Sequence, residues 1–107
     1  MKFTVITLFP EMFDKVFNTS MLWKAQDRGL VEFELINLRD FGIGPRHQVD
    51  DTPYGGGAGM VVRADVVYDA YQSVKDESSK VIYLSPQGKK LNQSKVQELS
   101  KEKHLIL

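Results

Sequence analysis

The spacing of hydrophobic positions changes several times along the first forty residues of the chain. Residues 2–9 are rich in β-branched and aromatic side chains and stop at Pro10, which predicts a buried strand followed by a helix with proline in its first turn. The apolar residues of 10–17 recur at helical spacing, and a second short helix follows and ends at Gly29. Residues 30–38 alternate apolar with acidic residues, which predicts a half-exposed strand near a sheet edge.

The pattern beyond residue 63 again predicts helices and strands in alternation. Residues 64–75 have helical spacing, and Asn92 is placed to cap a helix over 93–101. The inward face of the first of these helices is expected to hold Val67, Ala70, Tyr71 and Val74. Short apolar runs at 80–84 and 103–107 predict buried strands. Strands separated by helices indicate βαβ units, so we expect an α/β fold with a parallel sheet in three layers.

Composition excludes several classes of protein. Hydrophobic residues at 42% and charged residues at 26% are typical of a globular chain. Lysine plus arginine and aspartate plus glutamate number 14 each, so only a local positive patch is available for nucleic acid. The absence of cysteine excludes disulfides and thiolate metal sites and favours a reducing compartment. The apolar first nine residues lack the basic segment of a signal peptide and are too short to span a bilayer, which predicts a cytoplasmic protein without membrane contact.

A long segment without periodicity, residues 42–61, contains the sequence DDTPYGGGAGM. Four of the chain's eight glycines lie between Gly55 and Gly59. A structureless stretch of this length inside a domain is usually functional or disordered, and dense glycine indicates that something approaches the backbone closely. The segment is not a P-loop, because Gly59 is followed by Met60, and the glycine spacing does not match a dinucleotide-binding fingerprint.

The residues able to carry chemistry are few. Ligands of open α/β sheets bind outside the carboxyl ends of the strands, where the glycine-rich segment and the turn at residues 85–88 are expected. The two histidines, His47 and His104, do not predict a metal site with Asp50 and Asp51, and we expect His104 at a strand edge. The two aspartates are either bases or hydrogen-bond partners of loop amides, and the residue type favours the second.

Three segments in the same order and spacing resemble the bacterial tRNA (guanine-N1)-methyltransferase family of the knotted SPOUT superfamily. They read MKFTVITLFPEMF, RHQVDDTPYGGGAGM and VIYLSPQGKKL. The resemblance spans the whole chain but only the amino-terminal part of the family. It implies a parallel-sheet, three-layer SPOUT-like methyltransferase domain, with residues 1–107 forming the amino-terminal part of the S-adenosylmethionine-binding α/β domain. The chain would be truncated before the trefoil knot is complete, and the carboxyl-terminal RNA-binding domain would be absent.

The resemblance also implies an activity: methylation of N1 of the guanine immediately 3′ of the tRNA anticodon, with S-adenosylmethionine as methyl donor, in a homodimer. The general base would lie beyond Leu107, so no catalytic residue is expected in this chain and no metal is required. The cofactor-binding residues would be Tyr83, Leu84, Ser85, Pro86, Gln87 and Gly88. The tRNA-binding residues would be Arg46, His47, Asp50, Tyr54, Gly55, Gly56, Gly57 and Gly59. Thr52 stands where many relatives carry arginine, and Ala58 where many carry proline.

Two other interpretations remain open on the sequence. One is a non-catalytic α/β fragment that folds or dimerises and binds little. The other is a small nucleotide-binding module unrelated to methylation. Under the family interpretation, the 107 residues are expected not to methylate tRNA by themselves.

Overall fold

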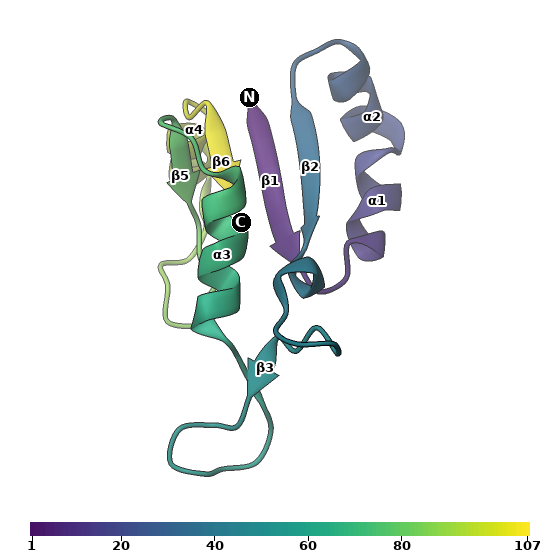
Figure 1. Ribbon diagram of the computed structural model, residues 1–107. Coiled ribbons are helices and arrows are strands. Elements are labelled where there is room, and N and C mark those ends of the chain that lie inside the picture. The colour runs from purple at the N-terminus through teal and green to yellow at the C-terminus, as the bar shows by residue number, and fades with distance from the viewer.

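The computed structural model describes all 107 residues and contains one four-stranded sheet with helices on both faces (Figure 1). A separate two-stranded hairpin projects from one end of the molecule. The elements in chain order are β1 (Lys2–Thr7), α1 (Glu11–Phe17), α2 (Ser20–Asp27), β2 (Glu32–Asn37), the 3-10 helix η1 (Leu38–Phe41), β3 (Asp50–Asp51), β4 (Val61–Val62), α3 (Ala64–Val74), β5 (Ser79–Val81), α4 (Gln93–Leu99) and β6 (His104–Ile106).

The main sheet has the strand order β2-β1-β6-β5, and every pair in it is parallel. The steps from β1 to β2 and from β5 to β6 run in one direction across the sheet, and the step from β2 to β5 runs in the other. Right-handed crossovers therefore place α1, α2 and α4 on one face and α3 on the opposite face. Figure 1 shows this arrangement, with α3 in front of the sheet and α4 behind it. The predicted α/β fold with a parallel sheet is confirmed, as is the position of β2 at an edge.

Two apolar layers hold the helices onto the sheet. On the α1 side, the ring of Phe33 stacks between those of Phe17 and Phe3, at centroid distances of 4.1 and 5.4 Å. On the α3 side, the core consists of Leu38, Val49, Val66 and Ala70. Burying a side chain the size of valine, leucine or phenylalanine contributes about 1.5–3 kcal/mol.

The inward face of α3 differs by one position from the prediction. Val66 and Ala70 are buried, whereas Val67 is 40% exposed. Val66 and Ala70 lie one helical turn apart and point at η1 and the sheet, while Val67 and Tyr71 face an open cavity. The sequence pattern did not separate the two faces because both are apolar.

Two predictions of strand burial were wrong. The run at 80–84 was expected to be buried, but Val81 is 52% exposed because β5 is the outermost strand and Val81 faces the open cavity on the α3 side. His104 was expected at a strand edge, but β6 lies between β1 and β5 and His104 is only 2% exposed. Strand order cannot be read from the apolar pattern of single strands, which explains both errors.

The buried His104 connects three parts of the chain. Its Nδ1 lies 2.9 Å from Asp76 Oδ2, and its Nε2 lies 2.8 Å from Thr4 Oγ1. The hydroxyl of Ser78 donates to Asp76, and this bond, followed by weaker contributions that include His104, lowers the pKa of Asp76 to about 2. The network joins β1, β6 and the α3–β5 connection. No buried side-chain polar atom of the chain lacks a hydrogen-bond partner.

The chain exposes much apolar surface. Its accessible surface is 8274 Å², whereas a compact monomer of this mass would expose about 6,100 Å². Only nine of the 107 residues are buried. The excess comes from the projecting hairpin and from incompletely covered sheet faces (Figure 1). None of the helices has the length and apolar character needed to cross a bilayer.

Candidate functional site

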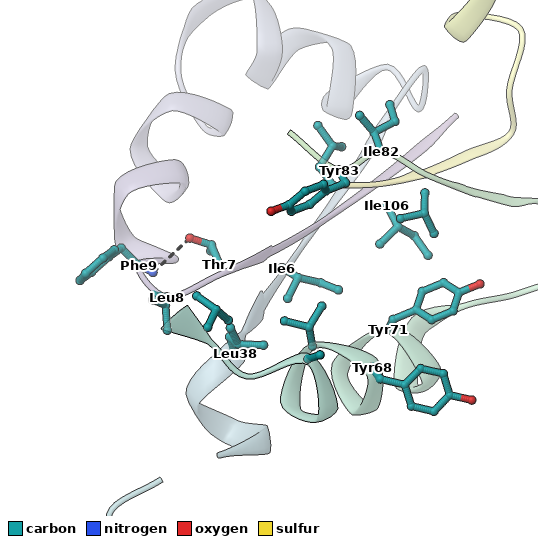
Figure 2. Close-up of a pocket in the computed structure, with 15 residues that line it drawn as sticks. Ile6, Thr7, Leu8, Phe9, Leu38, Tyr68, Tyr71, Ile82, Tyr83 and Ile106 are labelled. Atoms are coloured by element: carbon teal, nitrogen blue, oxygen red, sulfur yellow. Dashed lines mark hydrogen bonds between the residues drawn. The ribbon is translucent and has the colours of Figure 1, made fainter. Parts of the chain in front are cut away.

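An apolar cavity of about 960 Å³ lies at the carboxyl ends of β1, β5 and β6. It is open to the α3 side of the sheet. Figure 2 shows Ile82 and Tyr83, from the segment after β5, on the opposite side of the cavity from Tyr68 and Tyr71 of α3. Fourteen of its 15 lining residues are hydrophobic. A cavity of this size and character at this end of a parallel sheet is the expected place for a small ligand with a flat apolar part.

The segment after β5 offers free backbone groups beside this cavity. The N–H of Ile82 donates to Ile106, but the N–H groups of Tyr83, Leu84 and Ser85 donate no hydrogen bond within the chain. The carbonyls of Tyr83 and Leu84 accept none. Tyr83 lines the cavity, whereas Leu84 lines a second apolar hollow on the α1 side of the sheet. The segment therefore crosses from one face of the sheet to the other at its carboxyl end, and its backbone donors and acceptors remain available to a ligand.

A tight turn follows this segment. The N–H of Gly88 donates to the carbonyl of Ser85 at 3.1 Å, and the N–H of Gln87 donates to the Ser85 hydroxyl at 3.2 Å. A Cβ added at Gly88 would lie 3.3 Å from the Ser85 carbonyl oxygen, so the turn leaves little room for a side chain there. Ser85 is thus a turn residue, and nothing near it acts as the base that a serine nucleophile needs.

The glycine-rich segment forms the loop of the β3–β4 hairpin. Asp50 pairs with Val62 and Asp51 with Val61, and the loop between the strands projects away from the body of the protein (Figure 1). Tyr54 at its tip is fully exposed. Arg63 closes the base of the hairpin, because its guanidinium lies 3.3 Å from Asp51 and 3.0 Å from Asp65.

The four glycines of the loop have different reasons to be glycine. Gly55, Gly56 and Gly59 have φ values of 81°, 76° and 86°, a conformation that costs other residues about 1–2 kcal/mol. Gly57 does not have a positive φ. A Cβ at any of the four would meet no atom within 4 Å. The chain itself therefore does not require glycine at position 57, and the space around it is free for a ligand.

A second, polar cavity of about 620 Å³ lies where β2 ends and β3 begins. It brings together the predicted residues Arg46, His47 and Asp50. Tyr54 and the four loop glycines do not line it. Arg39, which the sequence analysis did not identify, lines the same cavity from η1. The signal that could have identified it is its place directly after the carboxyl end of a parallel strand.

The two cavities adjoin, because Leu8 and Val62 line both. The two aspartates of β3 have separate roles. Asp51 accepts a hydrogen bond from the Thr52 N–H at 2.8 Å and pairs with Arg63, as expected for a loop-stabilising carboxylate. The Asp50 carboxylate makes no hydrogen bond and faces the polar cavity. No three histidine, aspartate or glutamate side chains lie close enough together to hold a metal ion.

Comparison with known proteins agrees with this architecture. The chain has a TM-score of 0.82 and 35% identity to the crystal structure of tRNA (m1G37) methyltransferase from Aquifex aeolicus, over 99% of this chain and 49% of that one. Two curated relatives are tRNA (guanine-N(1)-)-methyltransferases. The one from Carboxydothermus hydrogenoformans is 49% identical over 99% of this chain and 42% of its own length. The one from Dictyoglomus turgidum is 50% identical over 100% of this chain and 44% of its own length. The chain thus spans less than half the length of these curated relatives.

The match to the family extends from end to end of the chain. The family model of the tRNA (Guanine-1)-methyltransferase TrmD aligns with residues 1–107, and the fold agrees with that of the solved relative. The chain therefore belongs to the tRNA (guanine-1)-methyltransferase family.

Proposed function

We propose that this chain is the amino-terminal part of an enzyme that methylates N1 of the guanine 3′ of the tRNA anticodon, using S-adenosylmethionine. Membership of the family supports the reaction, and the adjoining cavities support a division of the substrates between them. The observation that carries the proposal is the segment Tyr83–Gly88, with free backbone groups beside a large apolar cavity.

The residues present fit S-adenosylmethionine. An adenine ring needs an apolar slot for its faces and hydrogen-bonding groups for its edge. The cavity supplies aromatic and aliphatic walls. Tyr83, whose backbone N–H and C=O are unpaired, lines it, and the unpaired backbone groups of Leu84 follow directly along the chain. Ser85, Pro86, Gln87 and Gly88 would complete the turn against which the ligand packs. When bound, the cofactor would supply an electrophilic methyl group at this end of the sheet.

The loop of the hairpin would hold the RNA. Gly55, Gly56, Gly57 and Gly59 leave open space on which a guanosine could lie, and the ring of Tyr54 is free to stack on a base. Arg46, His47 and Asp50 at the adjoining polar cavity would contact the same nucleotide or its neighbours. N1 of guanine carries a proton that a base must remove as the methyl group arrives. The family resemblance assigns that base to the part of the protein beyond Leu107. Within this chain, Asp51 is engaged by Arg63, whereas the Asp50 carboxylate is unpaired.

We further propose that the whole enzyme is a cytoplasmic homodimer. The compartment is supported by the tRNA substrate that the family's name implies. The dimer is supported by the apolar surface that this chain leaves uncovered on both faces of its sheet. In the dimer, the active site would include residues from beyond Leu107.

The test uses a chimera in which the carboxyl-terminal part of the Carboxydothermus hydrogenoformans relative follows Leu107. We expect this chimera to form 1-methylguanosine in unmodified tRNA, detected by mass spectrometry after digestion, and the 107-residue chain alone to form none. A misplacement of reacting groups by about 1 Å costs on the order of a hundredfold in rate, and the chain alone positions the guanine poorly. Methylation by the chain alone, at the rate of the chimera, would place the base among its own residues, with Asp50 the first to replace.

The cofactor site is tested by Gly88→Val in the chimera, with binding measured by calorimetry. The added side chain crowds the turn at Ser85, so we expect S-adenosylmethionine affinity to fall at least tenfold, the effect of about 1.4 kcal/mol. Gln97→Val places a valine on the exposed face of α4 and is the matched control, with unchanged affinity. Equal affinity in both variants would remove the turn from the cofactor site.

A further inference from the structure

The polar cavity carries an excess of positive charge. Its charged lining consists of Arg39 and Arg46 against the single carboxylate of Asp50, with His47 beside them. The rest of its wall is formed by neutral side chains, including Gln48 and Met60. Two guanidinium groups around one hollow repel each other unless an anion lies between them.

Neither arginine has a partner within the chain. No carboxylate lies within 4.0 Å of the guanidinium of Arg39 or Arg46, and neither side chain makes a hydrogen bond. Arg63, a short distance along the chain, is the contrasting case, because it pairs with Asp51 and Asp65. The fork of donors on a guanidinium matches the oxygens of a phosphate, so two unpaired forks at one hollow form a phosphate-binding arrangement.

The backbone that carries Arg46 and His47 is fixed before any ligand binds. Ile43 and Gln48 exchange both backbone hydrogen bonds, at 2.9 and 3.0 Å, and the His47 N–H closes a turn on the Gly44 carbonyl at 3.1 Å. His47 has a φ of 52°, a conformation that few residues other than glycine adopt. Backbone of this kind is retained where the surrounding structure determines it, and it is concentrated at ligand sites.

The backbone of Arg39 is fixed separately. Asn37 accepts a hydrogen bond from the Arg39 N–H at 3.0 Å and so caps η1 at the end of β2. Leu38, which lies between Asn37 and Arg39, is buried in the core. The two arginines therefore approach the cavity from two independent rigid elements, which is the arrangement that lowers the entropy cost of binding.

We propose that Arg39 and Arg46 together bind one backbone phosphate of the RNA substrate in this cavity, with His47 at its edge. The inference rests on the proposed function and adds to it a residue, Arg39, and a ligand atom group, a phosphodiester. The position fits, because Leu8 and Val62 separate this cavity from the apolar one and Met60 joins it to the glycine loop. Phosphate contacts set the register of a nucleic acid, so this pocket would place the neighbouring guanine at the shared wall.

The first test compares Arg39→Gln and Arg46→Gln in the chimera, with an anticodon stem-loop RNA and fluorescence anisotropy at several salt concentrations. Each phosphate contact contributes about 0.7 to 0.9 to the slope of log affinity against log salt, so each variant should lose that much slope and bind about five- to eightfold more weakly at about 0.1 M salt. Arg28→Gln, at the end of α2 and away from the cavity, is the matched control with unchanged slope. An Arg39→Gln variant that behaves like Arg28→Gln overturns the proposal.

The second test identifies the shared phosphate. RNAs carrying one neutral methylphosphonate each, at successive positions around the guanosine, are bound to the wild-type chimera and to both variants. At one position, the neutral linkage should weaken RNA binding by the wild-type chimera as much as Arg39→Gln weakens binding of the unmodified RNA. At that position, the Arg39→Gln and Arg46→Gln variants should bind the neutral RNA no more weakly than the wild-type chimera does. Losses that multiply at every position would mean that the two arginines contact different phosphates, which overturns the shared pocket.

A third measurement separates this inference from the proposed function. Inorganic phosphate is titrated into the isotope-labelled chimera while the side-chain N–H signals of Arg39 and Arg46 are followed by NMR. We expect both signals to shift together and the Arg46 shift to diminish in Arg39→Gln. If the chimera methylates tRNA but these signals do not move and the salt slope is unchanged, the pocket is wrong and the function stands. If they move while methylation and RNA binding are absent, the anion site stands as a free-phosphate site and its assignment to RNA is overturned.

Discussion

The loops on either side of β3 use glycine for opposite reasons. The loop before it, residues 42–48, is tight: a Cβ on Gly42 would lie 2.3 Å from the carbonyl carbon and oxygen of His47. The backbone of Gly42 has an ordinary φ of −64°, so only space requires glycine there. The loop after it, residues 52–60, is open: no atom lies within 4 Å of a Cβ at Gly55, Gly56, Gly57 or Gly59, and three of these have positive φ.

The difference separates a rigid part of the site from an adaptable one. The first loop holds Arg46 and His47 in a fixed turn and loses little entropy when a ligand binds. The second loop is held at its base by the short β3–β4 pairing and Arg63. Within the loop, one backbone hydrogen bond runs from the Gly56 N–H to the Pro53 carbonyl at 3.1 Å. The loop can therefore change shape around a nucleotide, and it must lose conformational entropy in doing so.

The largest expected effect comes from Gly42→Ala. The new methyl group would overlap backbone atoms of His47, which cannot rotate away, so the turn must open or η1 must shift. Overpacking of this kind costs about 1–3 kcal/mol, and we expect a loss near the upper end in urea unfolding followed by circular dichroism. Because Val49 in the same segment is a core residue, the displacement also weakens the α3 contacts. A loss below about 0.5 kcal/mol, within the range of ordinary surface substitutions, would show that the tight loop is not rigid.

The second effect distinguishes glycines within the open loop. Gly56→Ala forces alanine to a φ of 76° and should cost about 1 kcal/mol, or shift the hairpin tip to another conformation. Gly57→Ala has no positive φ to strain and meets no neighbouring atom, so the free energy of unfolding should rise by about 0.4–1 kcal/mol, through the lower entropy of the unfolded chain. If Gly57 is where a nucleotide approaches the backbone, Gly57→Ala should nevertheless weaken RNA binding by the chimera. Equal stability losses in the two variants would contradict the distinction by φ.

The sequence predicted most of the fold because the main strands and helices have clear periodicity. The alternation of Phe33 and Leu35 with Glu32 and Glu34 indicated a half-exposed strand, and the structure places it at the edge of the sheet. It did not predict which strands are central, so His104 was assigned to an edge although it is buried between β1 and β5. Strand order depends on long-range pairing, which no local pattern encodes.

The site was predictable only in part, for a related reason. The glycine loop and the turn at 85–88 were found by composition and resemblance, and Arg46 and His47 by their place within a segment that resembles the family. Arg39 lies outside those motifs, and only the fold brings it to the same cavity as Arg46. The reason for glycine at position 42 was also hidden, because a steric contact with His47 depends on the turn between them.

The smallest expected effect is an acid-induced loosening of the open loop, which should leave the tight loop unchanged. Hydrogen bonds from Arg63 lower the pKa of Asp65 below its ordinary value of 3.8, so the folded chain binds this proton more weakly than the unfolded chain does. The resulting stabilisation is complete well above that value and is lost as the pH falls through the lowered pKa. We therefore expect the amide exchange rate at the Asp50–Val62 pair, corrected for intrinsic rates, to increase slightly as the pH falls from about 5 to about 2.5, the range in which such carboxylates titrate.

The tight loop and two variants are the controls. The amide of His47 donates to the backbone carbonyl of Gly44, and its protection against exchange should stay the same over this range. Asp65→Asn should abolish the pH dependence at the hairpin. Asp76→Asn removes a carboxylate with a pKa of about 2 from beyond the opposite end of α3, and it should leave that dependence unchanged. Equal loosening of both loops, or an unaltered response in Asp65→Asn, would mean that Arg63 does not hold the base of the hairpin.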